Sequence, residues 1–575
     1  MHSRNVVWRL IGLLALISVV VSCGPAPTAA PTEPVAGETA AAEATATSVP
    51  DAEMGPVVES FQVMTNVATE DPARYEISRM AVEAWQEFGI PAELWPVQGS
   101  VMEEQAFNSK QFKVYFMNMD PRPARMEPEW WIRLHYGADA GETGMNFSGY
   151  QNPEFDALAD AERVETDIDE RKELVDQAQQ MLYDAHPFHI YANAKLAGVY
   201  NKDTFGDPTL FMGNPIYNFW GVQTLKPLTD RKVMRVGMAK DFETINPLAA
   251  NGGEDTFFLS LIYDSLCRIG LDGAPENWAA ESIDAVSASE YEVTLRDGMT
   301  WHDGQPVTAD DVAFTFNYFK EKEAPYFTSG LAGFDKAEVI GENQVRLTLT
   351  EPFVPFVATV MCEMPIVPKH VWESIESPLE FDNPQPIGSG PWKFDYLRPL
   401  EESMISRNAD HFQPPVADGM LHVVYGSMDG LLGAMEEGSI DVMGEVINVS
   451  MVEQLRDLPH IQVEEVTSFG VYGIQFNTRF EPFSDRYFRQ AMAYTMPIDQ
   501  IIEVALQGAA DPGGSVIAPA LKFWHNDDLP AWPYDLEKAR SILLEAGYTW
   551  DSEGKLHYPA ADSDNRLIDS GPQLY

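Results

Sequence analysis

The sequence predicts a mixed α/β protein built from several structural units. In some segments apolar residues recur every three or four positions, the spacing of one helix face, and in others they alternate as in strands. The chain has 575 residues, of which 45% are hydrophobic and 22% charged. These proportions are those of an ordinary globular protein and argue against a disordered chain or a multi-span membrane protein.

The chain is strongly acidic. It contains 38 lysine and arginine residues against 88 aspartate and glutamate residues, which gives a formal net charge of −50 at pH 7. Such a surface repels polyphosphate, so the charge argues against nucleic acid as a partner. Attraction of a basic patch to anionic lipid headgroups is disfavoured for the same reason.

Residues 1–23 resemble the signal peptide of an exported lipoprotein. Arg4 and Arg9 provide a basic start, and the apolar run Leu10–Val21 is long enough for a signal core but too short to span a bilayer. The run leads to Cys23, which follows a small residue and would receive the lipid. A plain signal peptide, or an N-terminal anchor with a coincidental cysteine, is the alternative.

Residues 24–56 predict a flexible linker. They are rich in Pro, Ala, Thr and Glu, and they hold too few large apolar side chains to offset the entropy of folding. With a lipid on Cys23, such a tether would hold a large body just outside a membrane.

The body begins near Val57 and alternates between helical and strand patterns. Residues 76–88 have a helical pattern, which the sequence Gly-Ile-Pro then stops. In the helix predicted for 167–184, Leu174, Ala178 and Leu182 lie on one face. The other predicted elements are, in chain order, strands at 92–95, 188–192 and 291–295, a helix at 310–319, a strand at 344–349, a helix at 535–546 and a strand at 554–558.

No catalytic or metal-binding motif is evident. The chain lacks G-x-S-x-G, P-loop, H-E-x-x-H and C-x-x-C patterns, so neither an enzyme nor a cofactor or metal is predicted. Ser389 lies between two glycines, but the spacing is wrong for a nucleophile elbow. His186 and His189 would lie on opposite faces of a strand, so we interpret them as structural or solvent-facing rather than as metal ligands. The segment Trp301–Gly304 predicts a tight turn because Asp-Gly favours turns.

Two further cysteines, Cys267 and Cys362, lie in the body. A disulfide between them would survive outside the cytoplasm. Two buried free thiols are the alternative, and the sequence leaves both open.

One long segment carries a family resemblance. Residues 295–312, LRDGMTWHDGQPVTADDV, closely resemble the signature of the family 5 extracellular solute-binding proteins, which are the peptide, dipeptide and nickel receptors of ABC importers. Residues 534–548 resemble the family helix D-P-x-x-A-x-x-L-L-x-x-A-G, with Leu536 in place of the proline and Ile542 in place of the first leucine. Shorter matches lie between these two, in family order, at 387–394, 407–408, 476–478, 482–485 and 488–491.

The order of the family segments is unusual. Residues 233–575 resemble the part that comes first in the family, whereas residues 112–131, 146–156 and 178–182 resemble its C-terminal part. We therefore interpret the chain as a circular permutation, with new ends near 56 and 565 and the old termini joined around 225–231. Permutation is tolerated where the original ends lie close together at the surface. A truncated tandem pair of incomplete copies is the alternative.

The resemblance implies a two-lobe periplasmic-binding-protein-like fold of the large family 5 class, with a ligand cleft between the lobes. One lobe would be residues 197–469, and the other would combine 57–196 with 470–575. It also implies a receptor that binds peptides or similar small solutes outside the cytoplasm and delivers them to an ABC permease and ATPase complex. A ligand-binding sensor of the same fold that feeds no permease is the alternative.

The resemblance also suggests ligand-binding residues. The family holds the ligand's ammonium near an Asp-Pro, and the match here is Glu127-Pro128, with Asp120-Pro121 as a competing alignment. Trp130 and Trp131 are candidate pocket walls, and Asn246 lies where the family's first loop meets the cleft. The alternatives are a solvated loop carboxylate for Glu127 or Asp120, core or hinge packing for the tryptophans and a plain turn for Asn246.

Overall fold

A computed structural model describes residues 54–141, 144–445 and 447–560. The signal and linker predictions, Cys23 included, lie outside the described residues. None of the helices within the described ranges combines the length and apolar character that a membrane span requires.

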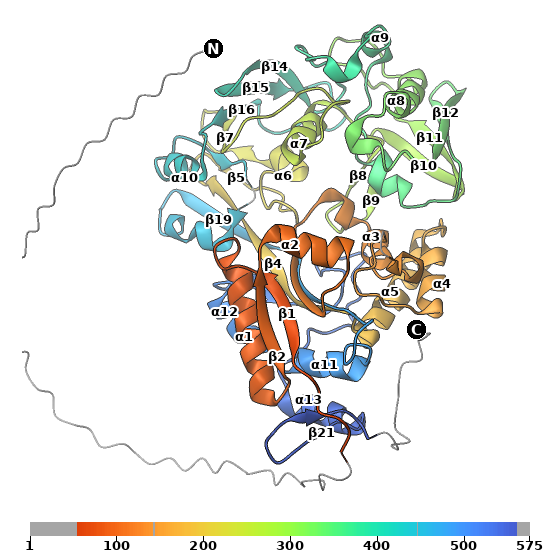
Figure 1. The fold of residues 1–575 in the computed structure, drawn as a ribbon. Coiled ribbons are helices and arrows are strands. Elements are labelled where there is room, and N and C mark those ends of the chain that lie inside the picture. The colour runs from red at the N-terminus through yellow and green to blue at the C-terminus, as the bar shows by residue number, and fades with distance from the viewer. Residues whose placement is uncertain (1–53, 142–143, 446, 561–575) are drawn as a thin grey trace, which may run out of the picture. The chain divides into compact units, whose positions relative to one another are not determined.

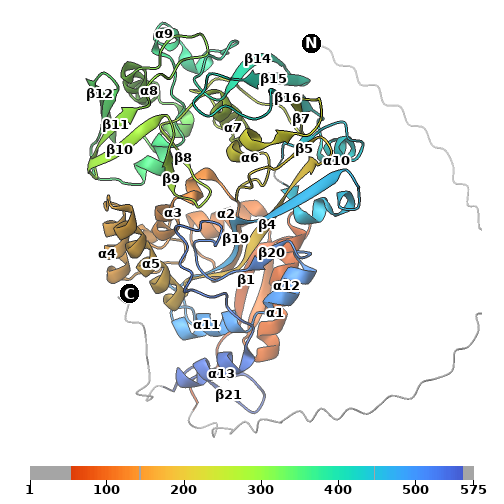
Figure 2. The same ribbon diagram turned by 180° about the vertical axis from the view of Figure 1, so that it is seen from behind.

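A twelve-stranded mixed sheet runs through the described body (Figures 1 and 2). Its strands are β1 (Phe61–Asn66), β2 (Ala92–Val97), β3 (Val114–Met119), β4 (Phe188–Asn201), β7 (Val233–Met238), β14 (Trp392–Arg398), β15 (Glu402–Arg407), β16 (Gly419–Val424), β17 (Val442–Met443), β18 (Ile447–Asn448), β19 (Ile461–Phe476) and β20 (Ala510–Pro512). The main path is β14-β15-β16-β7-β17-β4-β19-β3-β1-β2, and β18 and β20 pair with β4. The sequence prediction of a mixed α/β fold is confirmed.

The two long strands β4 and β19 connect the two halves of this sheet. They pair antiparallel from Ile461 opposite Asn201 to Gln475 opposite Phe188, with register shifts near the middle. β4 is almost entirely buried, as expected for a central strand with neighbours on both sides. Only the start of β4 was predicted from the sequence; its second half continues because β17, β18 and β19 all bond to it.

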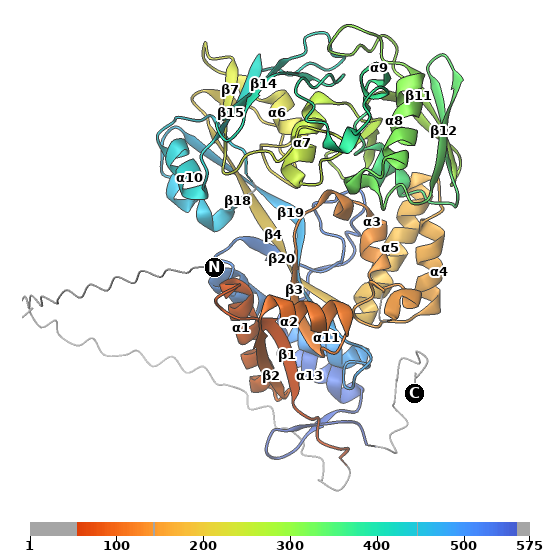
Figure 3. The same cartoon turned by 45° about the horizontal axis from the view of Figure 1, so that its top comes forward.

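The N-terminal and C-terminal parts of the body share one core. β19 pairs with β3, and β3 and β2 pair in parallel with β1. Helices α1 (Pro72–Phe88), α11 (Arg486–Tyr494) and α13 (Leu536–Glu545) lie beside this part of the sheet (Figure 3), and so does α12 (Ile498–Val504) (Figures 1 and 2). One apolar cluster joins both parts; its largest members are Phe61, Trp85, Phe116, Tyr191, Phe476, Phe483, Phe488 and Tyr548.

The chain also closes on itself at the edge of this core. The Val58 amide donates to the Leu556 carbonyl over 2.8 Å, and the Tyr558 amide donates to the Pro56 carbonyl over 2.9 Å. The strand predicted near 554–558 forms as β22 (Leu556–His557), paired with β21 (Thr549–Trp550). Backbone that is 500 positions distant in sequence is therefore adjacent in space.

The middle of the chain builds a second region. A four-stranded antiparallel sheet has the order β10 (Ala280–Ser287), β11 (Glu290–Leu295), β13 (Gln344–Leu349), β12 (Phe334–Gly341). Helix α8 (Ala309–Glu321) covers this sheet, and α9 (Lys369–Trp372) contacts α8. Helices α7 (Gly253–Ile262) and α10 (Met428–Glu436) contact strands of the long sheet instead. Short two-stranded ladders join β5 (Phe205–Gly206) to β6 (Lys226–Pro227) and β8 (Cys267–Ile269) to β9 (Pro275–Asn277).

Helix boundaries follow local capping chemistry. The helix predicted for 167–184 forms as α5 (Ile168–Ala185), where the Asp167 carboxylate accepts from the amides of the first turn. Thr308 and Asp311 form a capping box at the start of α8. Gly89, at φ 97°, ends α1 in the left-handed conformation that glycine adopts without strain. The remaining helices are α2 (Gly99–Glu103), α3 (Pro128–Arg133), α4 (Pro153–Glu162) and α6 (Phe219–Thr224).

The prediction that His186 and His189 lie on opposite strand faces is wrong. His186 ends α5 with φ 56°, so it precedes β4 rather than belonging to it. The two rings lie 5.0 Å apart, and burial lowers the pKa of both, to about 3 for His189. Within the described residues no group of three or more metal-ligating side chains is found. The turn predicted at Trp301–Gly304 is confirmed, with the Trp301 amide donating to the Gln305 carbonyl.

Candidate ligand-binding site

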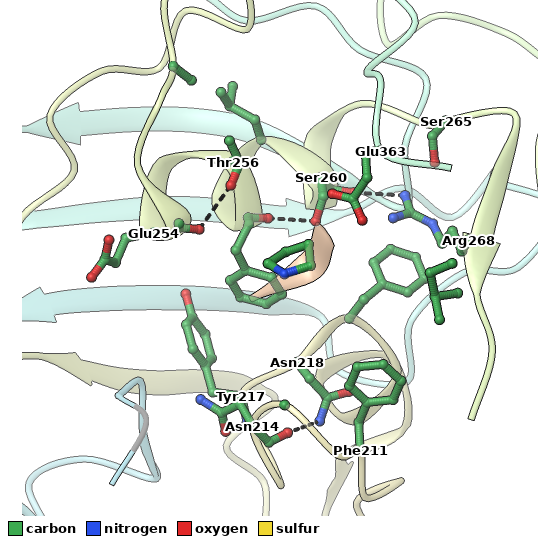
Figure 4. Close-up of a pocket in the computed structure, with 18 of the residues that line it drawn as sticks. Phe211, Asn214, Tyr217, Asn218, Glu254, Thr256, Ser260, Ser265, Arg268 and Glu363 are labelled. Carbon is green, nitrogen blue, oxygen red and sulfur yellow. Dashed lines mark hydrogen bonds between the residues drawn. The ribbon is translucent and has the colours of Figure 1, made fainter. Parts of the chain in front are cut away.

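A cavity of about 590 Å³ is the candidate site (Figure 4). Its lining comes from segments far apart in the sequence, among them 121–126, 211–220, 238–250, α7, β8, 326–327, 362–365, 444–445 and Phe469. The volume is within the range of small-molecule pockets, which runs from roughly 300 to 1,000 Å³. The cavity can therefore enclose a ligand the size of a short peptide or a large amine.

Most of the wall is apolar. Nine aromatic side chains contribute to it: Phe211, Tyr217, Phe219, Trp220, Phe257, Tyr263, Tyr326, Phe327 and Phe469. Several contact one another edge to face, as Tyr217 and Phe257 do with ring centroids 4.8 Å apart. Such packing fixes the rings in place, so the wall presents a preformed apolar surface.

Arg268 lies at one side of the cavity. Its side chain is buried, with its guanidinium carbon 3.5 Å from the centre of the Phe219 ring. Its Nη2 donates to the Ser260 carbonyl over 2.9 Å, and its Nε has no partner among the described residues. Burial lowers the pKa of Arg268 to about 10, against the opposing effect of the carboxylates of Asp264 and Glu363.

Glu363 lies near Arg268 without forming an ion pair to it in the described part of the chain (Figure 4). Burial raises the pKa of Glu363 to about 7, although the charge of Arg268 acts in the opposite direction. A carboxyl group with this pKa changes protonation state near neutral pH.

The opposite side of the cavity carries other charges. Lys240 pairs with Glu254, with 2.7 Å between nitrogen and oxygen, and the hydrogen bond from Lys240 lowers the pKa of Glu254. Glu445 accepts from the Ala239 amide over 2.7 Å, and burial raises its pKa. The lining residues of the described chain thus carry three carboxyl groups and two cations.

A buried carboxylate supports the wall from behind. Asp264 accepts from the Trp278 indole over 2.8 Å and from Ser389 over 2.9 Å, and it lies 3.2 Å from the His411 ring. Ser389 thus donates to an aspartate rather than to a histidine, which is a structural arrangement and not that of an activated nucleophile. The network anchors the chain that enters β8 and so positions Arg268.

Cys267 and Cys362 form a disulfide that joins segments 95 positions apart. The alternative of two free thiols is therefore wrong. Each cysteine directly precedes one of the two charged residues, Arg268 and Glu363. The bond holds the backbone of both residues in one place.

Glu127 lies outside the large cavity. It is 3% exposed and forms an ion pair with Arg171, which also pairs with Glu162 over 2.8 Å. It lines a smaller cavity of about 220 Å³ together with Arg171 and Trp524. Its carboxylate is engaged within the chain, so a contact to a ligand ammonium stays a prediction.

The other predicted residues also lie outside the lining of the large cavity, although Pro121, Met126 and Pro247 belong to it. Asp120 is exposed, 3.9 Å from Arg122. Trp131 is fully buried and donates to the Arg125 carbonyl, while Trp130 is half-buried beneath the Arg125 guanidinium.

Asn246 is buried, and its side chain forms hydrogen bonds with backbone groups. Its amide nitrogen donates to the carbonyls of Pro378 and Phe381, each over 2.7 Å, and its oxygen accepts from the Leu248 amide. These bonds hold the turn that carries Pro247 to the cavity. A direct role in binding stays a prediction.

Arg268 and Glu363 are the polar residues that sequence reasoning missed. Neither belongs to a family motif quoted above, and nothing in their local patterns distinguishes them from surface charges. The one signal in the sequence that could have linked them is that each directly follows a cysteine, so a disulfide would bring both residues together.

Comparison with known proteins gives the same family as the sequence motifs. The model of the bacterial extracellular solute-binding proteins, family 5 Middle, matches residues 274–570, just over half of the chain. The peptidoglycan-binding protein YepA of Agrobacterium fabrum is 27% identical over 356 residues, which are 55% of this chain and 56% of that protein. The dipeptide-binding protein of Escherichia coli is 25% identical over 303 residues, 48% and 55% of the two chains. The chain spans about half the length of the curated relatives it matches.

Solved structures are also similar. The ABC transporter substrate-binding protein CtaP from Listeria monocytogenes is 27% identical, with a TM-score of 0.44 over 56% of this chain and 66% of its own. The ABC transporter-associated periplasmic binding protein DppA from Helicobacter pylori is 24% identical, with a TM-score of 0.41 over 55% and 66%. Because the family model matches more than half of its residues, this chain belongs to the family 5 bacterial extracellular solute-binding proteins.

Proposed function

We propose that this protein is a non-catalytic receptor of an ABC importer that binds peptides or similar small solutes outside the cytoplasm and delivers them to the permease. The observation that carries the proposal is the aromatic cavity of about 590 Å³, together with membership of the family. The names of its relatives, a peptidoglycan-binding and a dipeptide-binding protein, favour ligands built from amino acids.

Native mass spectrometry of protein purified from its source tests the proposal, because enclosed ligands co-purify. We expect a bound solute in the parent protein and none after Ser260→Trp, since Ser260 lines the cavity and a tryptophan there would fill it. Ser374→Trp, at an exposed position outside the cavity lining, is the control and should keep the ligand. A parent protein that carries no solute and binds no peptide would contradict the proposal, and so would a solute that survives Ser260→Trp unchanged.

We also propose that a lipid on Cys23 anchors the receptor to the cell membrane. The support is the basic, then apolar, leader that ends in a serine followed by Cys23. Cys23→Ala should release the body from the membrane fraction of a detergent-free lysate. Identical fractionation of the parent and substituted proteins would refute the anchor.

We further propose that the body is a circularly permuted family domain. In support, β3 pairs with β19 and β1 pairs with β3, and the segments up to residue 192 and from residue 474 onward share one apolar cluster. The backbone bonds between Pro56–Val58 and Leu556–Tyr558 support the same order, because they join the strand that ends one family part to the start of the other. A tandem pair of incomplete copies would separate these segments.

A further inference from the structure

We propose that the cavity selects ligands that carry a protonated amine on an apolar body, and that the amine binds to Glu363. This inference rests on the proposed function, since it assumes that the cavity is the solute site. It differs from the expectation based on family motifs, which places the ligand ammonium at Glu127 or Asp120.

Glu127 and Glu363 differ in whether their carboxylates already have partners. Glu127 is 3% exposed and already paired with Arg171. Glu363, by contrast, lines the large cavity, and its carboxylate forms neither a hydrogen bond nor an ion pair with any of the described residues. A half-buried carboxylate without a donor is costly, and a ligand N–H group would remove that cost.

The charges around the cavity also favour a cationic ligand. Lys240 is occupied by Glu254, and Arg268 directs Nη2 to the Ser260 carbonyl and stacks on Phe219. Asp264 lies behind Arg268, and its carboxylate stabilises the positive charge of the guanidinium more strongly than Glu363 does. With three carboxyl groups against two cations in the lining, and Asp264 behind Arg268, the cavity carries an excess of negative charge.

An apolar wall lies next to Glu363. Tyr326 and Phe327 lie on one short helical turn, with their rings 5.0 Å apart, and the negative charge of Glu363 contributes to the raised pKa of Tyr326. Aromatic faces attract cations as well as apolar groups. An amine at Glu363 would therefore place its hydrocarbon body against the rings that line the cavity.

Dansylcadaverine tests this inference, because it joins one primary amine to a fluorescent aromatic body. N-acetyl-dansylcadaverine is the matched probe without the charge. We expect the parent protein to bind the amine roughly 10- to 100-fold more tightly than the acetylated probe, the usual range for a hydrogen bond to a charged group. Glu363→Gln should bring the two affinities together, whereas Glu376→Gln, at an exposed position outside the cavity, should leave the ratio unchanged.

A pH series on the parent protein gives a second readout that needs no variant. Only the ionised carboxylate holds the amine, so affinity for dansylcadaverine should fall as the pH is lowered from 8 to 6, through the pKa of Glu363 at about 7. The charged and titratable groups that face Glu363 are Arg268 on β8 and Tyr326 on the 325–327 turn, and neither changes protonation in this range. Affinity for the acetylated probe should stay constant.

The outcomes separate the two proposals. Equal affinities for both probes, or loss of the preference in Glu445→Gln but not in Glu363→Gln, would overturn the amine inference. Probe binding that Ser260→Trp abolishes would still support the cavity as the solute site. Absence of binding by either probe also counts against the amine inference, and the mass-spectrometry result then decides on the proposed function separately.

Discussion

Glu127, Glu162 and Arg171 form a buried cluster in which one guanidinium serves two carboxylates. Their side chains are 3%, 0% and 5% exposed, and Arg171 bonds to both acids. Glu162 also keeps one oxygen without a partner among the described residues. Burial of such a cluster costs desolvation energy, so it is stable only while the guanidinium is present. The carboxylate of Glu127, which family motifs mark as a ligand group, is thus engaged in a buried ion pair.

Substitution of Arg171 by methionine should be strongly destabilising. It leaves two buried carboxylates without a counter-charge, and we expect the free energy of unfolding to fall by about 3–5 kcal/mol in urea titrations. Arg122→Met is the matched control, because the Arg122–Asp120 pair is exposed, with 3.9 Å between its charged atoms, and should contribute less than about 1 kcal/mol. Equal effects of the two substitutions would show that the cluster does not stabilise the fold.

The same cluster predicts a pH dependence of stability. Burial raises the pKa of Glu162 from 4.5 to about 7, so the folded protein binds a proton more readily than the unfolded chain does. The stabilising contribution is fully present below pH 4.5 and is lost as the pH rises through 7. Relative to Glu162→Gln, the parent protein should gain stability when the pH is lowered from 8 to 6. A difference that does not change with pH would contradict this assignment.

At the scale of elements, local signals predict helices better than strands. α5 and α8 begin at Asp167 and Thr308, whose side chains cap the first turn, and such caps are visible in the sequence. β4 is different, because its 14 residues exceed the short strand predicted at 188–192. Its extra length comes from pairing with β19, which lies more than 250 positions further along the chain. No local pattern encodes that partner.

The disulfide joins two elements that carry the site, β8 and the segment after residue 361. Removing it by Cys267→Ala with Cys362→Ala should lower the free energy of unfolding by about 2–4 kcal/mol, because the unfolded chain loses a cross-link across 95 positions. Dansylcadaverine binding should weaken as well, since Arg268 and Glu363 lose their shared anchor. Chemical denaturation and probe titration of the double variant provide the test. Unchanged stability would mean that the bond does not constrain the unfolded chain.

At the scale of the whole molecule, the sequence predicted the family but not the cavity. Each family motif is a short contiguous stretch of sequence, so it can be recognised without knowledge of the fold. The cavity, in contrast, is defined by side chains from 121–126, 211–220, 253–269 and 326–365, which meet only after folding. The ligand-binding residues predicted from family motifs lie outside the lining of this cavity, because a motif does not show which side chains meet in space. They are Glu127, Asp120, Trp130, Trp131 and Asn246.

The order of the segments gives a test of how the whole body is assembled. A protease site inserted between Thr229 and Asp230, in an exposed connection, would cut the chain where the old termini are proposed to be joined. If the body is one permuted domain, the two products should stay together in gel filtration, because β4 pairs with β19 and one apolar core spans the cut. Light scattering should report the mass of a single chain, 64.1 kDa before the added site.

The matched control for this experiment is the same cut in denaturing urea, which should release two separate fragments. An uncut sample carrying the same insertion shows whether the insertion alone disturbs folding. Fragments that separate in native buffer would contradict the permutation, because residues 61–119 and β19 would then belong to independent bodies. Fragments that stay associated only as a dimer of cut chains would also contradict it, since the pairing would then join two molecules. A single associated monomer is the result that the Val58–Leu556 and Tyr558–Pro56 backbone bonds require.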